Sequence, residues 1–252
     1  MRRPPTTDRL RLDELLVSRG FFEIRSRARD AIARGTVSVG GETIAKPGKT
    51  VPTDAEVTVD DPAQRYVSRA ALKLVHALDH FGFDPANRIA LDVGASTGGF
   101  TQVMLERGAA HVIAIDVGHG QMRPGLASDP RVRNIEGLNA RDLRQEDLAG
   151  RTPAFVVSDV SFISLRLALP PALALASPGA FGVFLVKPQF EAGRGQIGKG
   201  GIVDPTLGGE IATDMAGWLG EQPGWRAAGV TASPIEGGDG NREFLLGGVK
   251  DR

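Results

Sequence analysis

Cysteine is absent from the 252 residues, and the four histidines are scattered without the spacing of a metal site. The first absence excludes disulfides and thiolate zinc sites and suits a reducing compartment, so we expect a cytoplasmic protein. Neither sign of charge dominates, because 30 Lys and Arg stand against 30 Asp and Glu. Only the distribution of charge is informative: residues 1–59 carry 11 basic and 8 acidic side chains, a net charge of +3, which leaves −3 for the remainder.

An uninterrupted membrane-spanning helix is also missing. Residues 167–186, LALPPALALASPGAFGVFLV, carry no charge over 20 residues, the length of a spanning segment. Pro170, Pro171 and the Ser177-Pro178-Gly179 break interrupt this stretch, so we predict a buried helix, a turn and a buried parallel strand over 180–186. The start of the chain, MRRPPTTDRL, has charges but no apolar core. We therefore expect neither a signal peptide nor stable membrane association.

The most informative stretch is IALDVGASTGGF, residues 89–100, which combines an apolar run, a glycine turn and the start of a predicted helix. This geometry presents backbone N–H groups and a helix N-terminus to a ligand, and glycine permits close approach. The spacing G-x-x-x-G-G differs from the G-x-G-x-x-G of dinucleotide-binding proteins. A second apolar run, HVIAID, ends in Asp116, whose carboxylate could accept both ribose hydroxyls of a nucleoside. A structural turn beside a solvated Asp116 is the alternative.

Residues 9–59 are predicted to form a small module of two helices and short strands. Helical spacing indicates helices over 9–18 and 26–34, with Ser26 as an N-cap and Gly35 just past the second helix. Short runs separated by Gly and Pro indicate a β-hairpin unit that ends at Val59. Five arginines lie within residues 19–34. A helix face carrying Arg25 and Arg29 could bind phosphates, and a solvated surface is the alternative.

The stretches RLDELLVSRG and SRARDAIARGTVSVGGETIAKPGKTV resemble an S4 domain, the small RNA-binding module of ribosomal protein S4 and pseudouridine synthases. The resemblance covers residues 9–59 and has one departure, Gly40, where the family usually has Asn; both residues tolerate a positive φ. It favours RNA contact by the basic helix. The residues that we assign to RNA binding are Arg9, Arg25, Arg27, Arg29, Arg34 and Arg69.

Polar residues 60–67 are predicted to be a linker, and residues 68–250 a second domain. Ser68 is expected to cap a helix that runs to about Phe81. Further predicted strands cover 132–135, 154–159 and 181–187, further helices cover 161–176 and 205–219, and residues 225–233 and 243–249 form a closing strand pair. This order predicts an open α/β sheet, doubly wound and largely parallel, with one antiparallel edge strand. Ligands of such sheets bind at the carboxyl ends of the strands, a rim where we expect Gly94, Asp116, Asn139, Asp159 and Lys187.

The motifs SRAALKL, LDVGASTGGF, AID, NARD, SDVSFIS, LVKPQFE, GKGGIVDP and GNREF follow one another in this order. Together they resemble the TlyA (haemolysin A) family, which joins an S4 domain to an FtsJ-like RNA ribose 2′-O-methyltransferase, and the resemblance covers nearly the whole chain. It implies a seven-stranded Rossmann-like class I methyltransferase sheet, S-adenosylmethionine as cofactor, and methylation of cytidine riboses in small- and large-subunit ribosomal RNA. Two departures are Ala70-Ala71 in place of Gly-Gly and a shortened GKGGIVDP loop without a usual basic residue.

By the same resemblance, the K-D-K-E tetrad of FtsJ-like enzymes corresponds to Lys73, Asp159, Lys187 and Glu243. The implied cofactor-binding residues are Asp92, Gly94, Ser96, Gly98, Gly99, Phe100, Asp116, Asn139 and Asp159. A ribose hydroxyl is a poor nucleophile until its proton leaves or its developing charge is stabilised. We therefore expect Lys187 to orient and deprotonate the hydroxyl, Asp159 and Glu243 to position it, and Lys73 to shape the local field. The transfer needs no metal.

Three other functions share parts of this pattern. A nicotinamide-dependent oxidoreductase would use the same sheet and Asp116, but G-x-G-x-x-G is missing and Lys187-Pro188 argues against it. A non-catalytic S4-type ribosome-binding protein would have no reason to keep four charged groups at one rim. A pore-forming haemolysin would need a spanning or amphipathic segment that the chain lacks. We expect a monomer that acts on ribosomal RNA or ribosomal subunits.

Overall fold

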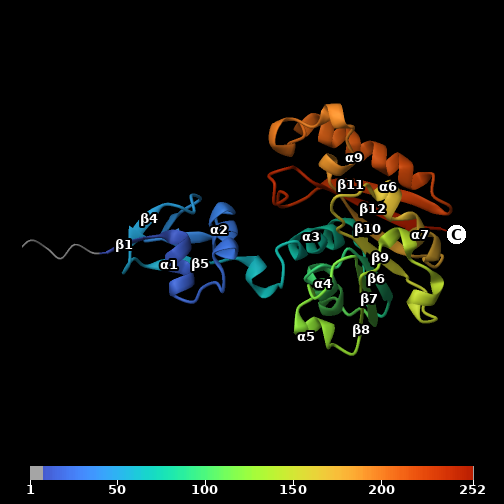
Figure 1. The fold of residues 1–252 in the computed structure, drawn as a ribbon, viewed down its shortest axis with the longest axis horizontal. Coiled ribbons are helices and arrows are strands. Elements are labelled where there is room, and N and C mark those ends of the chain that lie inside the picture. The colour runs from blue at the N-terminus through green and yellow to red at the C-terminus, as the bar shows by residue number, and fades with distance from the viewer. Residues whose placement is uncertain (1–7, 252) are drawn as a thin grey trace, which may run out of the picture. The chain divides into compact units, whose positions relative to one another are not determined.

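The computed structural model describes residues 8–251, which divide into two compact units between Arg65 and Tyr66 (Figure 1). The linker bounds of 60–67 stay a prediction; a short 3-10 helix, η1 (Pro62–Arg65), lies within that range. No helix among the described residues is long and apolar enough to cross a membrane. In the charge-free stretch the predicted buried strand is confirmed as β10 (Phe181–Val186), whereas the single helix predicted over 161–176 is wrong: two short helices form instead, α6 (Leu165–Ala168) and α7 (Pro170–Leu175).

The first unit packs two helices, α1 (Leu12–Ser18) and α2 (Arg25–Ala33), around an apolar core that includes Leu12, Leu16 and Ile32. Strands β3, β2 and β5 form one sheet in that order, and β1 pairs with β4 in a separate antiparallel ladder. The bounds of these strands are β1 (Arg9–Arg11), β2 (Val37–Val39), β3 (Glu42–Thr43), β4 (Thr50–Pro52) and β5 (Val57–Val59).

Two predicted helix starts in this unit are wrong. Residues 9–11 form β1 against β4, so the first helix begins only at Leu12. The second helix begins at Arg25, with Ile24 as the N-cap residue and no side chain capping it, so Ser26 lies inside the helix. The predicted helix end is confirmed, because Gly35 follows α2 with a left-handed φ of 74°.

The second unit is built on a seven-stranded sheet with the order β11-β12-β10-β9-β6-β7-β8. Its strands are β6 (Ile89–Val93), β7 (His111–Asp116), β8 (Val132–Glu136), β9 (Phe155–Ser158), β10, β11 (Trp225–Ala232) and β12 (Phe244–Lys250). Strands β6 to β10 pair in parallel, whereas β12 runs antiparallel to both β10 and β11. The prediction of an antiparallel edge strand is therefore wrong in its placement: β12 lies inside the sheet, hydrogen-bonded on both sides, and β11 forms the edge.

Helices cover both faces of this sheet, and strand residues alternate between the two cores (Figure 1). Leu91 and Phe184 pack on the side of α6, α7 and α9 (Pro205–Gly220), whereas Val183 and Leu185 pack on the side of α3 (Ala71–Phe81) and α4 (Gly99–Glu106). The remaining helices are α5 (Pro124–Ala127), α8 (Pro188–Glu191), η2 (Ala140–Asp142), η3 (Gln145–Leu148), η4 (Arg194–Gln196) and η5 (Lys199–Gly201). The expected cap at Ser68 is wrong, because α3 starts at Ala71 and the Ser68 hydroxyl accepts the N–H of Ala70, which precedes the helix, at 3.2 Å.

Candidate active site

The glycine turn after β6 brings three backbone segments together more closely than side chains would allow. Gly94 has a φ of 86°, and a Cβ there would lie 2.8 Å from the carbonyl oxygen of Asp159. Gly98 precedes α4 with a φ of 94°, and a Cβ on Gly99 would lie 2.9 Å from Cβ of Ser68. The G-x-x-x-G-G spacing therefore places β6, the start of α4 and the loop after β9 around one point.

Asp92 lies beneath this turn and is fully buried. The Thr101 hydroxyl donates to Oδ2 of Asp92 at 2.7 Å, and Oδ1 has no hydrogen-bond partner among the described residues. Burial raises the pKa of Asp92 to about 7, because it disfavours the charged form. The hydrogen bond from Thr101 opposes this effect, and the nearby Asp159 carboxylate adds to it.

The carboxyl ends of the parallel strands form the rim that the sequence predicts. Asp116 ends β7, Asp159 follows β9, and Lys187 follows β10. The Asp116 carboxylate accepts the N–H of Ser96 at 2.8 Å and that of Gly118 at 2.7 Å, which fixes its orientation. Asp116 therefore lies at the carboxyl end of β7 with both carboxylate oxygens oriented by backbone N–H groups.

Two adjoining depressions follow this rim. The larger is a groove of about 1170 Å³ that runs past Asp116, Asn139 and Phe162, and the smaller is a hollow of about 160 Å³ beside Phe100 and Lys187. Their shared lining residues are Gly94, Ser96, Asp159 and Ser161. A long ligand could therefore extend from the groove into the hollow.

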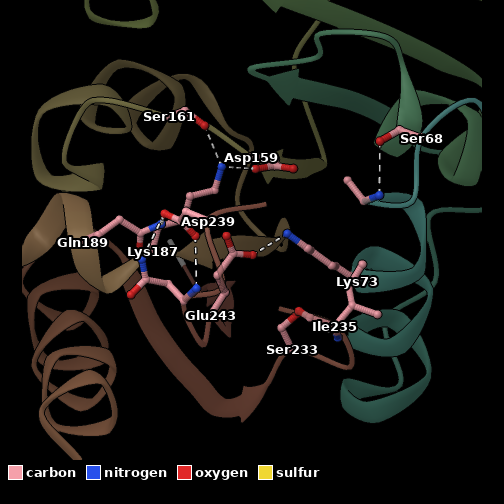
Figure 2. A network of polar contacts seen from close by, with 12 residues as sticks. Ser68, Lys73, Asp159, Ser161, Lys187, Gln189, Ser233, Ile235, Asp239 and Glu243 are labelled. Carbon is pink, nitrogen blue, oxygen red and sulfur yellow. Dashed lines mark hydrogen bonds and ion pairs between the residues drawn. The ribbon is translucent and has the colours of Figure 1, made fainter. Parts of the chain in front are cut away.

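The four residues of the tetrad form two ion pairs (Figure 2). Lys187 Nζ lies 2.7 Å from Oδ1 of Asp159 and donates to the hydroxyl of Ser161 at 2.8 Å. Lys73 Nζ donates to the Glu243 carboxylate, and both side chains are buried. Glu243 directly precedes β12, whose pairing with β10 sets it beside Lys187, but its carboxylate binds Lys73 of α3.

The predicted cofactor residues fall into two groups. Gly94, Ser96, Gly99, Phe100, Asp116, Asn139 and Asp159 line the groove, the hollow or both. Asp92 and Gly98 are not among these lining residues: Asp92 supports the turn from below, and Gly98 would carry a Cβ only 2.6 Å from Leu126 Cδ1. Of the tetrad, Lys187 and Asp159 line the hollow, and the Lys73–Glu243 pair is buried outside its lining.

Three residues of this region are not singled out by the sequence. Ser161 contacts Lys187, and Phe162 is 90% exposed with a φ of 64°, an uncommon conformation for a bulky residue. The Phe162 ring lies 5.2 Å from that of Phe190. Glu191 accepts hydrogen bonds from the loop that carries Ser161. Their motifs, SDVSFIS and LVKPQFE, are evident in the sequence, but a motif does not show which of its members contact one another.

The arginines assigned to RNA binding differ in their contacts. Arg25 pairs with the buried Asp13 at 3.0 Å, and Arg34 pairs with the buried Asp61 at 2.8 Å. Arg29 is exposed and has no partner among the described residues. Arg9 donates to the Thr50 carbonyl, Arg27 donates to the Ala63 carbonyl, and Arg69 is half-buried ahead of α3.

Comparison with known proteins identifies the same two parts. The model of the FtsJ-like methyltransferase family matches residues 66–250, and that of the S4 domain matches residues 10–57. The chain belongs to the FtsJ-like methyltransferase family. The predicted seven-stranded methyltransferase sheet and the predicted resemblance to TlyA are both confirmed.

Similar FtsJ-like proteins align over almost the entire chain. The 16S/23S rRNA (cytidine-2′-O)-methyltransferase TlyA of Mycobacterium tuberculosis is 47% identical, covering 94% of this chain and 89% of that protein. Hemolysin A of Brachyspira hyodysenteriae is 42% identical, covering 94% of this chain and 98% of that protein. A solved structure from Streptococcus thermophilus, described as a candidate hemolysin, has 40% identity and a TM-score of 0.74, covering 97% of this chain and 90% of that one.

Proposed function

We propose that this protein is an S-adenosylmethionine-dependent methyltransferase that modifies the ribose 2′-hydroxyl of cytidines in ribosomal RNA. The observation that carries the proposal is the placement of Lys187. This residue is only 9% exposed, and it lines the hollow at the carboxyl ends of the strands, which adjoins the long groove. The activity of the Mycobacterium tuberculosis relative, as its name states it, supports the substrate, and the S4 match supports an RNA partner.

The residues around the groove fit S-adenosylmethionine. Asp116 would accept the ribose hydroxyls, Asn139 would lie near the adenine, and the turn from Gly94 to Gly99 would hold the amino-acid end in the hollow. The close approach of Gly94 to Asp159 leaves no room for a side chain at the junction of the two depressions. When bound, S-adenosylmethionine would supply an electrophilic methyl group for the 2′-oxygen.

The role of Lys187 follows from its partners. The amine forms an ion pair with Asp159 and serves first as a hydrogen-bond donor that stabilises negative charge on the 2′-oxygen. The amine donates one hydrogen bond, to Ser161, and forms an ion pair with Asp159, which leaves an N–H group for the ribose oxygen. The hydroxyl proton can then reach the Asp159 carboxylate through the amine, which donates one proton as it accepts another.

Lys73 and Glu243 act at greater distance from the reacting oxygen. Because both are buried and bonded to each other, they add no net charge and hold β12 against α3 beside the site. In this role the pair maintains the electrostatic environment of Lys187 and fixes the packing of α3 on the start of β12.

Phe162 supplies a surface for a nucleobase. Its ring is exposed at the rim of the groove, on the same loop as Asp159 and Ser161, and packs against Phe190. A base that leaves its stack can lie against an exposed aromatic ring, a contact worth about 1–3 kcal/mol. A flipped cytidine held there would bring its own ribose toward Lys187.

The test is transfer of labelled methyl groups from S-adenosylmethionine to separated small and large ribosomal subunits, followed by mapping of the methylated nucleotides. We expect label on cytidine riboses, detected as resistance of the adjoining phosphodiester bond to alkali. Label on a base, or on protein alone, would contradict the proposal. A Lys187→Ala enzyme serves as the matched blank for the assay.

A further inference from the structure

Contacts outside the tetrad join the loop after β9 to the segment after β10. Lys187 contacts Ser161, the Phe162 and Phe190 rings pack together, and Glu191 binds the start of α6. These contacts follow each other in the same order along residues 159–165 and 187–191. The two segments thus form one assembly, with the reacting amine at one end and the Glu191 carboxylate at the other.

Glu191 makes the contacts that fix the far end of this assembly. Its Oε2 accepts the Ser164 hydroxyl at 2.5 Å, and its Oε1 accepts the Leu165 N–H at 2.8 Å. The Ser164 oxygen in turn accepts the Arg166 N–H at 3.1 Å. Glu191 is half-buried, and burial raises the pKa of its carboxyl group while the two contacts oppose that rise.

The loop that Glu191 holds carries both partners of the Lys187 amine. Asp159 and Ser161 lie three to six residues before the contacts of Glu191, and they are the polar partners of Lys187 Nζ among the described residues. A shift of this loop would therefore change the direction of the amine. A displacement of about 1 Å at a reacting group can cost about a hundredfold in rate.

We propose that Glu191 is a positioning residue for methyl transfer: it anchors the 159–165 loop so that Ser161 and Asp159 direct the Lys187 amine at the ribose oxygen. This inference rests on the proposed function and adds to it a residue outside the tetrad. Glu191 does not touch the reacting atoms, and its effect passes through Ser161. Its removal and the removal of the Ser161 hydroxyl therefore disturb the same contact.

The experiment compares Glu191→Ala, Glu191→Gln, Ser161→Ala and the double variant Glu191→Ala/Ser161→Ala in single-turnover methyl transfer to ribosomal subunits. Glu191→Ala should lower the rate at saturating cofactor by about tenfold, a partial loss of orientation. Glu191→Gln should remain within about twofold, because an amide can accept the Leu165 N–H and donate to the Ser164 oxygen. The double variant should be no slower than the slower single variant, because coupled residues are not additive.

Glu221→Ala is the control, since Glu221 is an exposed acid at the end of α9 and is separated in sequence from residues 159–165 and 187–191. Thermal unfolding of each variant ensures that rates are compared among folded proteins. Independent, multiplicative losses in the double variant, or a wild-type rate in Glu191→Ala, would overturn the proposal. If the wild type itself methylates no ribosomal RNA, the proposed function fails, and crystal structures then decide this inference separately. An unchanged Lys187–Ser161 contact in Glu191→Ala would refute it, and a displaced one would support it.

Discussion

The Lys187 amine sits between a carboxylate at 2.7 Å and a hydroxyl at 2.8 Å, so its position is fixed before any substrate binds. Lys187→Ala should lower the single-turnover rate by about 10²–10³-fold, the loss typical of removing one donor to a developing oxyanion. Cofactor affinity, measured by calorimetry, should change little, because the proposed cofactor contacts are chiefly those of Asp116 and the glycine turn. Methylation of ribosomal RNA by Lys187→Ala at the wild-type rate would exclude this role.

Asp92 predicts a pH dependence of stability. Burial raises its pKa from 3.8 to about 7, so between these values the folded protein keeps a proton that the unfolded chain has released. The free energy of unfolding should therefore fall as pH rises through this window, by up to about 4 kcal/mol at 1.36 kcal/mol per pKa unit. Asp92→Asn keeps an oxygen for the Thr101 hydroxyl and should lose this dependence.

Urea unfolding of the cofactor-free wild type and Asp92→Asn at about pH 4.5 and pH 8 measures the difference directly, since all other titrating groups are common to both proteins. The free energy of unfolding of Asp92→Asn should increase relative to that of the wild type as pH rises. Parallel pH profiles for the two proteins would mean that Asp92 titrates in the folded state much as it does in the unfolded chain.

At the scale of single elements, the turn between β6 and α4 tolerates no side chain at Gly94. Gly94→Ala should abolish measurable cofactor binding and destabilise the protein by about 1–3 kcal/mol, because its φ of 86° is left-handed and the new Cβ would lie 2.8 Å from the Asp159 carbonyl. Gly125→Ala in α5 is the matched control: a Cβ there would meet no described atom within 4 Å beyond its own helix and chain neighbours, and its φ is ordinary. Equal melting temperatures and cofactor affinities for the two variants would contradict the role given to Gly94.

The elements that the sequence predicts well are those with a strong local signal. Buried parallel strands such as β7 and β10 are continuous apolar runs that end in or directly precede a charged residue, and both are found where predicted. Helix starts are predicted less accurately, because Ser26 and Ser68 are good capping residues whose hydroxyls do not cap a helix here. Strand order is a further limit: the run 243–249 indicates a strand, but only its pairing with both β10 and β11 places it inside the sheet.

In the candidate site, too, the sequence predicts the location of residues better than the contacts between them. Lys187 and Asp116 could be placed at the rim because parallel strands share one direction. The pairing within the tetrad could not, because it depends on which strand lies beside β10, and that is a tertiary property. The contact between Ser161 and Lys187 joins residues 26 apart in the chain, and no spacing rule predicts it.

For the molecule as a whole, the zero net charge conceals two parts of opposite sign, with +3 in residues 1–59 and −3 in the remainder. Attraction to RNA phosphates should therefore come chiefly from the first part and weaken with salt. Within it, Arg29 is exposed and without a partner among the described residues, whereas Arg34 is paired with Asp61, whose side chain is 2% exposed. The two arginines should consequently give opposite results on substitution.

Arg29→Ala should weaken binding to ribosomal RNA and reduce the slope of log affinity against log salt by about 1, with stability unchanged within about 0.5 kcal/mol. Arg34→Ala leaves a buried carboxylate unpaired and should lower the free energy of unfolding by about 3 kcal/mol. Arg34→Lys, which restores the charge, should recover part of that loss. Fluorescence titrations across a salt series, paired with urea unfolding, separate the effects. An unchanged salt slope in Arg29→Ala would show that the exposed face of α2 does not contact the phosphates, and RNA binding would then have to be sought on another surface.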